Sequence, residues 1–499
     1  MLEGVKPICS RTMAVNPKRT KSKKRNRKPA KVQASLVRTD KWVLFVSADE
    51  HHVLGLTVEQ YRLFVRPLVI AINSQWHNLE TVKSLDRFVF VEKMFIQTAK
   101  NPTPKHSYFA NRARLNPAFL KFPSYLRRAA INEAMGIVSS FRTRYDQWQR
   151  GIRSKRSAKP PSLTAMSNTY PALYRGQSIK YHANGTVEIK VWNGSDWVWL
   201  TVQAKSERKQ GRHLNPNNVQ ESPTLVVNAK HCRLSVPFTT NPDKLPDSDY
   251  VCAVDLGINN TAVASIVGKT GTVKARLFID QARDIDRRDK RATLIRRKAK
   301  IARRMRGELF KGFCSGHYRK SANINKQIAQ LTSRRIVDFA SRHGVSVIVF
   351  ENLSYWKAKG GRKRTALKQR FHRWCKDAIV RLTRDKWSES GGQIFTINAA
   401  YTSAYAYDGS GKLKRAKENY SQATFTSGKQ YNADLSASYN IGARYWYAIL
   451  NGDKAIGHHF TRVWEAKDSS QTQRIPVTLS SLWLQSQATT DTLTTSLIG

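Results

Sequence analysis

Three acidic residues, each in a different kind of segment, constrain most strongly how this chain can fold. Asp255 ends one apolar run, Glu351 ends a second, and Asp434 opens an amphipathic stretch. The two runs are typical of buried strands, and the stretch is typical of a helix. Such acids can converge on a pair of divalent cations, because Mg²⁺ is bound by hard oxygen ligands. The sequence therefore predicts two Mg²⁺ ions held by these three catalytic carboxylates, an arrangement that can hydrolyse a phosphodiester.

The chain is strongly basic, which points to a polyanionic partner. It holds 86 Lys and Arg residues against 35 Asp and Glu residues, for a formal net charge of +51. A protein with such a charge repels itself unless a polyanion neutralises it, and the excess runs through nearly the whole chain. A duplex of about 20 base pairs carries roughly 40 phosphates. The charge therefore indicates a protein that holds a large nucleic-acid complex, and together with the three acids it predicts a nuclease.

The composition also argues against several classes of protein. No run of about 18 residues is apolar, so we expect neither a membrane span nor a membrane partner. The N-terminus lacks the apolar segment of a secretory signal. The five cysteines are scattered and none forms a Cys-x-x-Cys pair, which favours reduced thiols over disulfides or a zinc ribbon. We therefore expect a cytoplasmic protein that binds no zinc.

Residues 1–31 form a polar arm that is dense in positive charge and carries no acid in its second half. We expect this arm to be disordered until it meets phosphate, with Lys23, Lys24 and Arg25 among the contacts. A localisation signal is the competing interpretation. Basic residues continue throughout the chain, however, so an RNA-binding arm is favoured.

The pattern between residues 32 and 247 changes from strand to helix and back. Residues 32–56 and 160–247 show the period of two that is typical of short strands, with Asn-Gly pairs as hairpin turns. Residues 57–159 are mostly helical in pattern, and Thr57 with Gln60 forms a candidate capping box. This order predicts a small β-barrel with a helical domain inserted after its first strand.

The long helical pattern at residues 281–342 is rich in arginine. Its basic residues recur at helical spacing, so most can face one polyanion, although a solvated helix surface is the competing interpretation. Six of them are expected nucleic-acid contacts, namely Arg287, Arg288, Arg296, Arg297, Arg303 and Arg304. Farther along, we expect Trp356 to stack on an unpaired base. The basic loop beside it is expected to contact nucleic acid through Arg362, Lys363 and Arg364.

The segments around the three acids resemble the three RuvC motifs of TnpB, the transposon-encoded RNA-guided nuclease, and of its descendants, the type V CRISPR effectors. The segment 251–260 resembles the first motif, and Phe350-Glu351-Asn352-Leu353 resembles the second. The segment 433–441, Ala-Asp-Leu-Ser-Ala-Ser-Tyr-Asn-Ile, is similar to the third, usually written Ala-Asp-x-Asn-Ala-Ala-x-Asn-Ile. The resemblance covers roughly residues 160–450 by order and spacing and is specific only near the motifs.

This resemblance implies an α+β multidomain protein built from three parts. The first is a wedge-like β-barrel at residues 32–56 and 160–247, and the second is a helical recognition domain inserted at residues 57–159. The third is an RNase H-like (RuvC) α/β nuclease domain, split between residues 248–400 and 432–455. The division agrees with the change of period along the chain.

The resemblance also implies the partners and the reaction. A guide RNA would supply target sequence by pairing, while the protein reads a short flanking DNA motif and the shape of the heteroduplex. The partners would be the guide RNA, the double-stranded DNA target and its displaced single strand. The implied location is the cytoplasm of a prokaryote, at the nucleoid when target is bound. A monomer and a homodimer both remain open, as does the origin of the guide in a CRISPR array or a transposon end.

The segment 401–431 departs from the family pattern. The family commonly carries two Cys-x-x-Cys pairs there, whereas this segment has no cysteine. A structural zinc site needs four thiolate or imidazole ligands, so we expect a cysteine-free remnant of the zinc-ribbon and target-binding insert. The remnant either forms a small ribbon held by Tyr405, Tyr407 and Phe425 or is a mobile nucleic-acid contact.

Two further expectations concern the C-terminal part of the chain. Asn440 lies over one and a half helical turns after Asp434, so we expect it to pack or to orient the helix rather than to bind metal. Residues 456–499 are rich in Ser, Thr and Gln and low in charge, which predicts a mobile tail.

Two other functions fit part of the sequence. An RNA-guided DNA-binding protein with weak or no cleavage could recruit or block other machinery. The intact set of three acids argues against it, while the missing cysteines leave it open. An unguided RuvC-like, structure-specific nuclease would need the same acids. The large charge excess and the long helical insertion argue against that second alternative.

Overall fold

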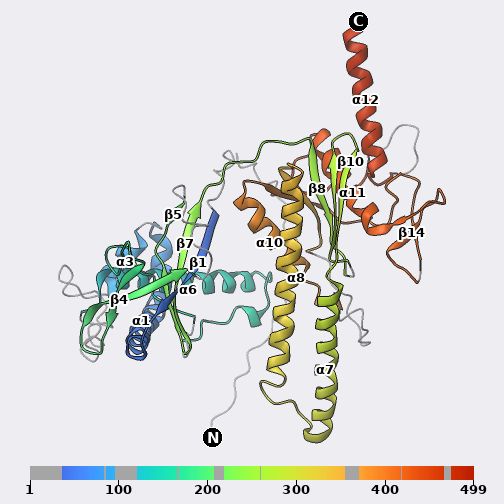
Figure 1. The fold of residues 1–499 in the computed structure, drawn as a ribbon. Helices are drawn as coiled ribbons and strands as arrows, with labels where there is room; N and C mark the ends of the chain where they lie inside the picture. Colours follow the sequence, from blue (N-terminus) through green and yellow to red (C-terminus); the bar gives the residue numbers. More distant parts are fainter. Residues whose placement is uncertain are drawn as a thin grey trace, which may run out of the picture. The chain divides into compact units, whose positions relative to one another are not determined.

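The computed structural model describes most of the chain from Leu36 onward (Figure 1). The described residues are 36–83, 86–95, 121–163, 166, 168–206, 218–258, 260–354, 370–371, 373–416, 418–465 and 474–498. Seven of the expected nucleic-acid contacts lie outside these ranges, namely Lys23, Lys24, Arg25, Trp356, Arg362, Lys363 and Arg364. The expected disordered arm at residues 1–31 also lies outside them.

An antiparallel sheet forms the first part of the described chain. Its strands are β1 (Leu36–Phe45), β2 (Ile179–Tyr181), β3 (Thr186–Trp192), β4 (Trp197–Ser206), β5 (Val219–Gln220), β6 (Thr224–Asn228) and β7 (His231–Thr240). They follow the order β2-β3-β4-β1-β7-β5, and β6 also pairs with β7. Strand β1 thus pairs with β4 and β7, which come more than a hundred residues later. This pairing places a helical insertion after the first strand, as the change of period predicts.

The insertion consists of α1 (Ala48–Ser74), α2 (Trp76–Thr81), α3 (Arg87–Phe95), α6 (Ser124–Gln149) and the short 3₁₀ helix η1 (Lys155–Ser157). Helices α1 and α6 pack against each other and share one hydrophobic core with the sheet. Leu54, Leu68 and Ile131 from the helices and Ile189 and Leu234 from the strands are fully buried in it. The helices and the sheet therefore support one another.

Helix α1 begins at Ala48, nine residues before the expected start of the helical segment at residue 57. Its capping box is formed by Ser47 and Glu50, each side chain bonding the other's backbone N–H. The candidate box at Thr57 and Gln60 is therefore wrong. The physical reason is that the buried stripe already includes Leu54, so the helix continues back to the earlier Ser.

Thr57 instead joins α1 to the sheet. Its side chain is fully buried, and its hydroxyl donates to the Val53 carbonyl at 2.9 Å and accepts from the Trp192 N–H at 2.8 Å. A buried N–H that loses its acceptor costs the desolvation of that group. The Thr57 hydroxyl therefore connects the last residue of β3 to the middle of α1.

We expect Thr57→Val to lower the free energy of unfolding by about 1–3 kcal/mol, because the Trp192 N–H then has no acceptor. Chemical denaturation of the full chain, followed by tryptophan fluorescence, measures this loss. Thr143→Val is the matched control, since its exposed hydroxyl bonds only the Ser139 carbonyl within α6. Equal losses in both variants would contradict the assigned role.

A mixed sheet forms the second part of the described chain. Its strands are β8 (Tyr250–Asp255), β9 (Ala262–Gly268), β10 (Val273–Ile279), β11 (Val347–Asn352), β12 (Gln393–Asn398) and β16 (His459–Phe460), in the order β10-β9-β8-β11-β12-β16. The pairs β10-β9 and β9-β8 are antiparallel, and the pairs from β8 to β16 are parallel. Parallel neighbours bring their carboxyl ends to the same edge of the sheet.

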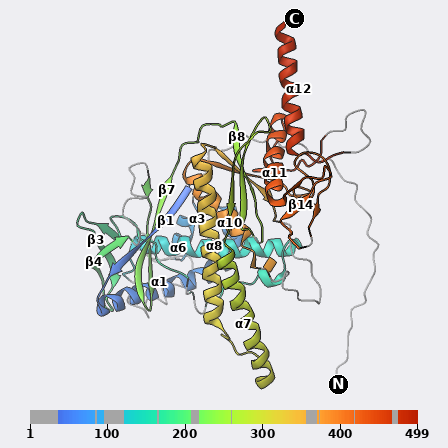
Figure 2. The ribbon, with the colours of Figure 1, turned by 45° about the vertical axis from the view of Figure 1, so that its right-hand side comes forward.

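Helices cover both faces of this mixed sheet (Figures 1 and 2). Helices α8 (Ser315–Arg342) and α10 (Lys376–Glu389) cover one face, and α11 (Ala433–Leu450) with the start of α12 (Leu479–Ile498) covers the other. Helix α7 (Ala282–Arg306) packs against α8 and runs away from the sheet, as does the rest of α12 (Figure 1). Cys252 and Val254 of β8 pack in the core with α8 and α10, whereas Val251 and Ala253 pack in the core with α11 and α12. This alternation follows from the period of two along a strand. No helix among the described residues is long and apolar enough to cross a membrane.

The cysteine-free insert at residues 401–431 contains a small three-stranded sheet. Its strands are β13 (Lys414–Arg415), β14 (Gln422–Thr424) and β15 (Gln430–Asn432). The Tyr407 ring lies 5.6 Å from Phe425 and 5.2 Å from Tyr431 by ring centroids. Tyr405 does not join this cluster and lies 6.1 Å from the Tyr401 ring instead. Aromatic packing thus holds the ribbon, with Tyr431 in the place expected for Tyr405.

The described C-terminal segment is packed onto the mixed sheet as far as Leu482, so the expected mobile tail is wrong over those residues. Strand β16 pairs with β12, and Phe460, Leu479 and Leu482 are buried in the core beside α11. Some apolar side chains of this polar segment face the core, whereas Ile456, Ile475, Trp483 and Leu484 are exposed. Its low charge permits that burial and does not indicate disorder.

Candidate active site and nucleic-acid interface

The fold brings the three acids to one end of the mixed sheet. Strands β8 and β11 are parallel, and Val254 pairs with Phe350. Because Asp255 follows Val254 and Glu351 follows Phe350, the two acids are neighbours. Both acids continue the sheet face that α11 covers, since they follow Ala253 and Val349 by two positions. Asp434 lies in the first turn of α11, so that all three carboxylates reach the same region.

Two features of α11 fix the position of Asp434. Asn432, rather than Asp434, is the N-cap, and its side chain accepts the Leu435 N–H at 2.9 Å. Gly442 allows the helix to lie close to β9, because a Cβ at this position would lie 2.7 Å from Val267. Asp434 is thus free of a capping role and is held over the sheet.

The three carboxylates influence one another's charge. The pKa of Asp255 is raised well above its usual range, first by burial and then by the charges of Glu351 and Asp434. Burial also raises the pKa of Glu351, against a hydrogen bond from Thr402. Burial raises the pKa of Asp434, against the charge of Arg415. Negative charge is therefore costly at this site, and a nearby cation would relieve that cost.

Sequence reasoning missed three residues that contact or face these acids. The Thr402 hydroxyl donates to Glu351, and Arg415 Nη1 lies 3.9 Å from Asp434 Oδ1. The buried Arg444 side chain donates to the carbonyls of Asn398 and Ala400, and burial lowers its pKa to about 10 while the charge of Glu351 opposes that shift. Thr402 is the second residue of the cysteine-free insert at residues 401–431, and Arg415 lies within the same insert.

Asn440 orients the elements around the site, as expected from its place in the helix. Its side-chain amide donates to the carbonyls of Thr402 and Tyr405, both at 3.0 Å. Its carbonyl oxygen accepts the Leu479 N–H at 3.3 Å. The side chain therefore connects α11 to the loop that carries Thr402 and to the C-terminal segment.

The donor set suits a hard divalent cation better than zinc, because it consists of carboxylates without a thiolate or an imidazole. Within the described ranges, however, no group of three or more His, Cys, Asp or Glu residues is arranged to hold a metal ion. Thr402 and Arg415 engage Glu351 and Asp434 instead. The three carboxylates are thus close enough for their charges to interact, but they do not converge on one shared metal position.

The exposed face of α7 carries four of the six expected arginine contacts. Arg296, Arg297, Arg303 and Arg304 are all solvent-exposed. Helices α7 and α8 run side by side as a long helical hairpin (Figure 1). The four guanidinium groups are therefore available to a polyanion.

The other two arginines are engaged within the protein. Arg287 is exposed but pairs with Asp284 at 3.0 Å. Arg288 is only 3% exposed, which contradicts its assignment as a nucleic-acid contact. It donates to Asp289, Asn325 and the Arg373 carbonyl, each at 3.1 Å. The reason is the helical period, because position 288 falls on the buried stripe of α7.

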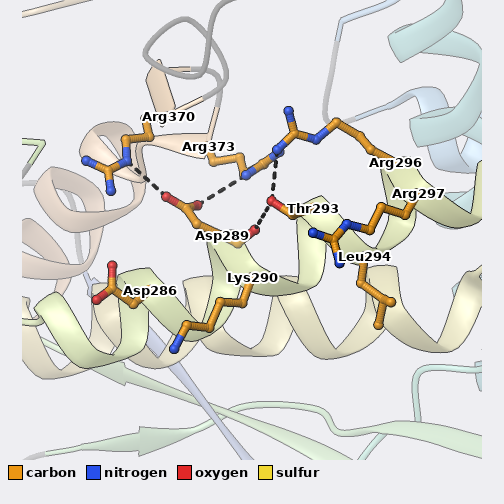
Figure 3. Close-up of a pocket in the computed structure, with 9 residues that line it drawn as sticks. All are labelled: Asp286, Asp289, Lys290, Thr293, Leu294, Arg296, Arg297, Arg370 and Arg373. Atoms are coloured by element: carbon orange, nitrogen blue, oxygen red, sulfur yellow. Dashed lines mark hydrogen bonds and ion pairs between the residues drawn. The ribbon is translucent and has the colours of Figure 1, made fainter.

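A basic hollow of about 680 Å³ lies beside α7 (Figure 3). Its cationic lining consists of Lys290, Arg296, Arg297, Arg370 and Arg373. The Asp289 carboxylate accepts from Arg370 and Arg373, each at 3.1 Å, and so holds them beside the helix. Sequence reasoning missed Arg370 and Arg373, since nothing in the local pattern shows that they meet α7.

Sequence comparison gives one match. A family model described as the Aq_aa04 family matches residues 38–193, a range that reaches from β1 to the end of β3. No curated protein matches the chain.

The chain is also similar to several solved structures. For the Cas12f1–sgRNA–target DNA complex the TM-score is 0.41 at 12% identity, over 81% of this chain and 99% of that chain. For the mini-RNA-guided endonuclease CRISPR-Cas_phi3 the TM-score is 0.43 at 10% identity, over 83% of this chain and 92% of that chain. For T. thermophilus RuvC with a Holliday junction substrate the TM-score is 0.21 at 10% identity, over 42% of this chain and 99% of that chain.

Proposed function

We propose that this protein is an RNA-guided DNA endonuclease that opens a DNA duplex and cuts it by two-metal phosphodiester hydrolysis. The observation that carries the proposal is the meeting of Asp255, Glu351 and Asp434 at one end of a mixed sheet. The net charge of +51 and the exposed arginines of α7 support a large nucleic-acid partner. The reading of a short flanking motif follows from the motif resemblance.

In this proposal the chain's own residues hold and orient the metal ligands. Asp255, Glu351 and Asp434 would hold two Mg²⁺ ions, with Asp434 giving up its ion pair to Arg415. Bound Mg²⁺ activates water and stabilises a leaving oxygen. Thr402 fixes the orientation of Glu351, and Asn440 fixes the loop that carries Thr402. Burial of Asp255 limits the access of bulk water to its carboxylate, and Glu351 beside it is half-buried.

The basic hollow would bind the sugar-phosphate backbone. Arginine guanidinium groups bind phosphate through paired hydrogen bonds, and such contacts position a nucleic acid without reading its sequence. Asp289 keeps Arg370 and Arg373 spaced along the hollow. We further propose that the protein acts in the cytoplasm and at the nucleoid, and that it binds no zinc.

Sequencing of the RNA that co-purifies with the protein, followed by cleavage assays, tests this function. We expect one defined RNA species, and we expect cleavage of matched plasmid DNA only with that RNA and Mg²⁺. Cleavage of branched DNA without RNA would instead support a structure-specific nuclease. Defined RNA and matched binding without cleavage would support the RNA-guided binding protein.

One observation favours that second candidate. Arg415 already pairs with Asp434, and the described residues offer no ready set of metal ligands. A protein that binds guided targets and recruits other machinery would tolerate this pairing. Mg²⁺ binding by the wild-type protein separates the two candidates.

We expect Asp255→Asn to raise the melting temperature by a few degrees in EDTA at neutral pH. The pKa of Asp255 is raised in the folded state, so its ionisation opposes folding above the unfolded pKa. The gain from Asn is therefore absent at acid pH and grows as the pH rises through the folded pKa. Thermal unfolding across this pH range measures the effect.

Added Mg²⁺ should raise the melting temperature of the wild type much more than that of Asp255→Asn, because binding to the folded state stabilises it. Asp249→Asn is the control, since this exposed carboxylate lies before the other end of β8 and pairs with Lys269. An equal response to Mg²⁺ in wild type and Asp255→Asn would contradict the metal assignment.

A further inference from the structure

A second hollow, of about 560 Å³, lies between α1, α6 and the first sheet. Residues of α6 form one wall, and the segment from Asn168 to Tyr174 and Thr224 of β6 contribute the other side. Both helices and the sheet belong to one hydrophobic core, which holds the walls in place. Hollows of this size commonly accept small molecules or single groups of larger ligands.

The lining of this second hollow differs from that of the basic one. Its described lining residues include the carboxylate of Glu133 and the amides of Asn132 and Asn168, but no Lys or Arg. No hydrogen bond or ion pair joins these three side chains to another described residue. In a chain of charge +51, this lining disfavours phosphate and suits a neutral group that carries several N–H donors.

Fixed aromatic rings stand beside these polar groups. The Tyr170 hydroxyl donates to Asn228 Oδ1 at 3.2 Å, and Arg62 Cζ lies 4.9 Å from the centre of the Tyr170 ring. The Tyr174 ring lies 5.5 Å from that of Tyr125. Arg62 covers one face of the Tyr170 ring, so a planar heterocycle would stack on the face of Tyr170 turned away from Arg62 or on the Tyr174 ring.

Gly136 borders open space in the α6 wall of the hollow. A Cβ at this position would meet no atom within 4 Å, and Gly136 belongs to the lining. Glycine within a helix costs about 1 kcal/mol relative to alanine. Close packing does not require it here, so the space it leaves is available to a ligand.

We propose that this hollow binds a guanine base of the nucleic acid that the protein holds. This inference rests on the proposed function only in taking the partner to be a nucleic acid. The Watson–Crick edge of guanine presents two neighbouring donors, N1–H and N2–H, which one carboxylate can accept together. Glu133 is that acceptor, and the two asparagine amides serve the remaining edge atoms. Burial raises the pKa of Glu133, so paired donors would offset the cost of its charge.

Binding of single strands of repeated UUG, UUA or UUC to the full chain, freed of co-purified RNA, tests the proposal. We expect the wild type to bind UUG repeats about tenfold more tightly than UUA repeats, the usual worth of one bidentate base contact. Glu133→Gln and Gly136→Leu should remove this preference and leave the affinity for UUA repeats and its salt dependence unchanged. Fluorescence anisotropy against salt gives both quantities.

Gly55→Leu is the matched control, because a Cβ at this α1 glycine also meets no atom within 4 Å, outside the hollow's lining. It should keep the preference. Equal affinity of the wild type for all three repeats, or a preference that survives in Glu133→Gln, would overturn the pocket. A preference for UUA or UUC would overturn guanine as the base. Failure to bind any strand would instead overturn the proposed function, and the matching TTG and TTA strands show whether RNA or DNA supplies the base.

Discussion

Asp255→Ala is expected to lower the rate of guided DNA cleavage by about a thousandfold or more and to leave guided target binding within a few-fold. The reason is that a ligand of a catalytic metal acts mainly on the transition state, where several kcal/mol of charge stabilisation are lost. In the proposed function the duplex would be held elsewhere, by cations such as those on α7. Cleavage kinetics and equilibrium binding with the same guide and target measure both effects.

Asp249→Ala is the control for this variant, since it removes an exposed carboxylate near the opposite end of β8. Its cleavage rate should stay close to that of the wild type. If Asp255→Ala still cuts at the wild-type rate, the three acids are not the active site. If instead it fails to bind target, the substitution has damaged the fold, and Asp255→Asn replaces it in the same assay.

Replacing the four exposed α7 arginines by Ala is expected to weaken binding of every guided target, on the order of a hundredfold or more at physiological salt. The residues are Arg296, Arg297, Arg303 and Arg304, all of them exposed. Each lost phosphate contact should also reduce the slope of log affinity against log salt by up to about 0.9. Binding isotherms over a range of salt, for two unrelated guide–target pairs, measure both quantities.

A variant with Lys at the same four positions is the control, because it keeps the charge and loses the paired guanidinium contacts. It should retain most of the salt slope. A loss confined to one target would show that these arginines read bases. No loss on either target would mean that this face of α7 is only solvated.

The meeting of the three acids could be predicted because it depends on local rules. Side chains alternate between the two faces along β8 and β11, which puts Asp255 and Glu351 on the same face of the sheet. A helix that packs on this face can bring Asp434 to the same two acids. The partners of these acids could not be predicted in the same way. Arg415 lies in a ribbon strand whose fold depends on ring packing between distant tyrosines.

The wrong expectations have two physical causes. The charge of Arg288 favours a nucleic-acid contact, whereas its position on the buried stripe of α7 decides its environment. The average composition of the C-terminal segment favours a mobile tail, whereas single apolar side chains such as Phe460 and Leu482 anchor its first part in the core. Within α1, two candidate capping boxes compete, and the one at Ser47 includes more of the buried stripe.

The hydrogen bonds from α11 to the C-terminal segment affect the order in which parts of the protein can fold during synthesis. Asn440 accepts from the backbone of Leu479, and Arg444 donates to the Val477 carbonyl. Chains fold as they emerge from the ribosome, N-terminal parts first. The nascent protein can therefore fold its first sheet and its α7–α8 hairpin well before these supports exist. A ribosome that stalls before Val477 therefore releases a chain whose three carboxylates lack part of their supporting framework.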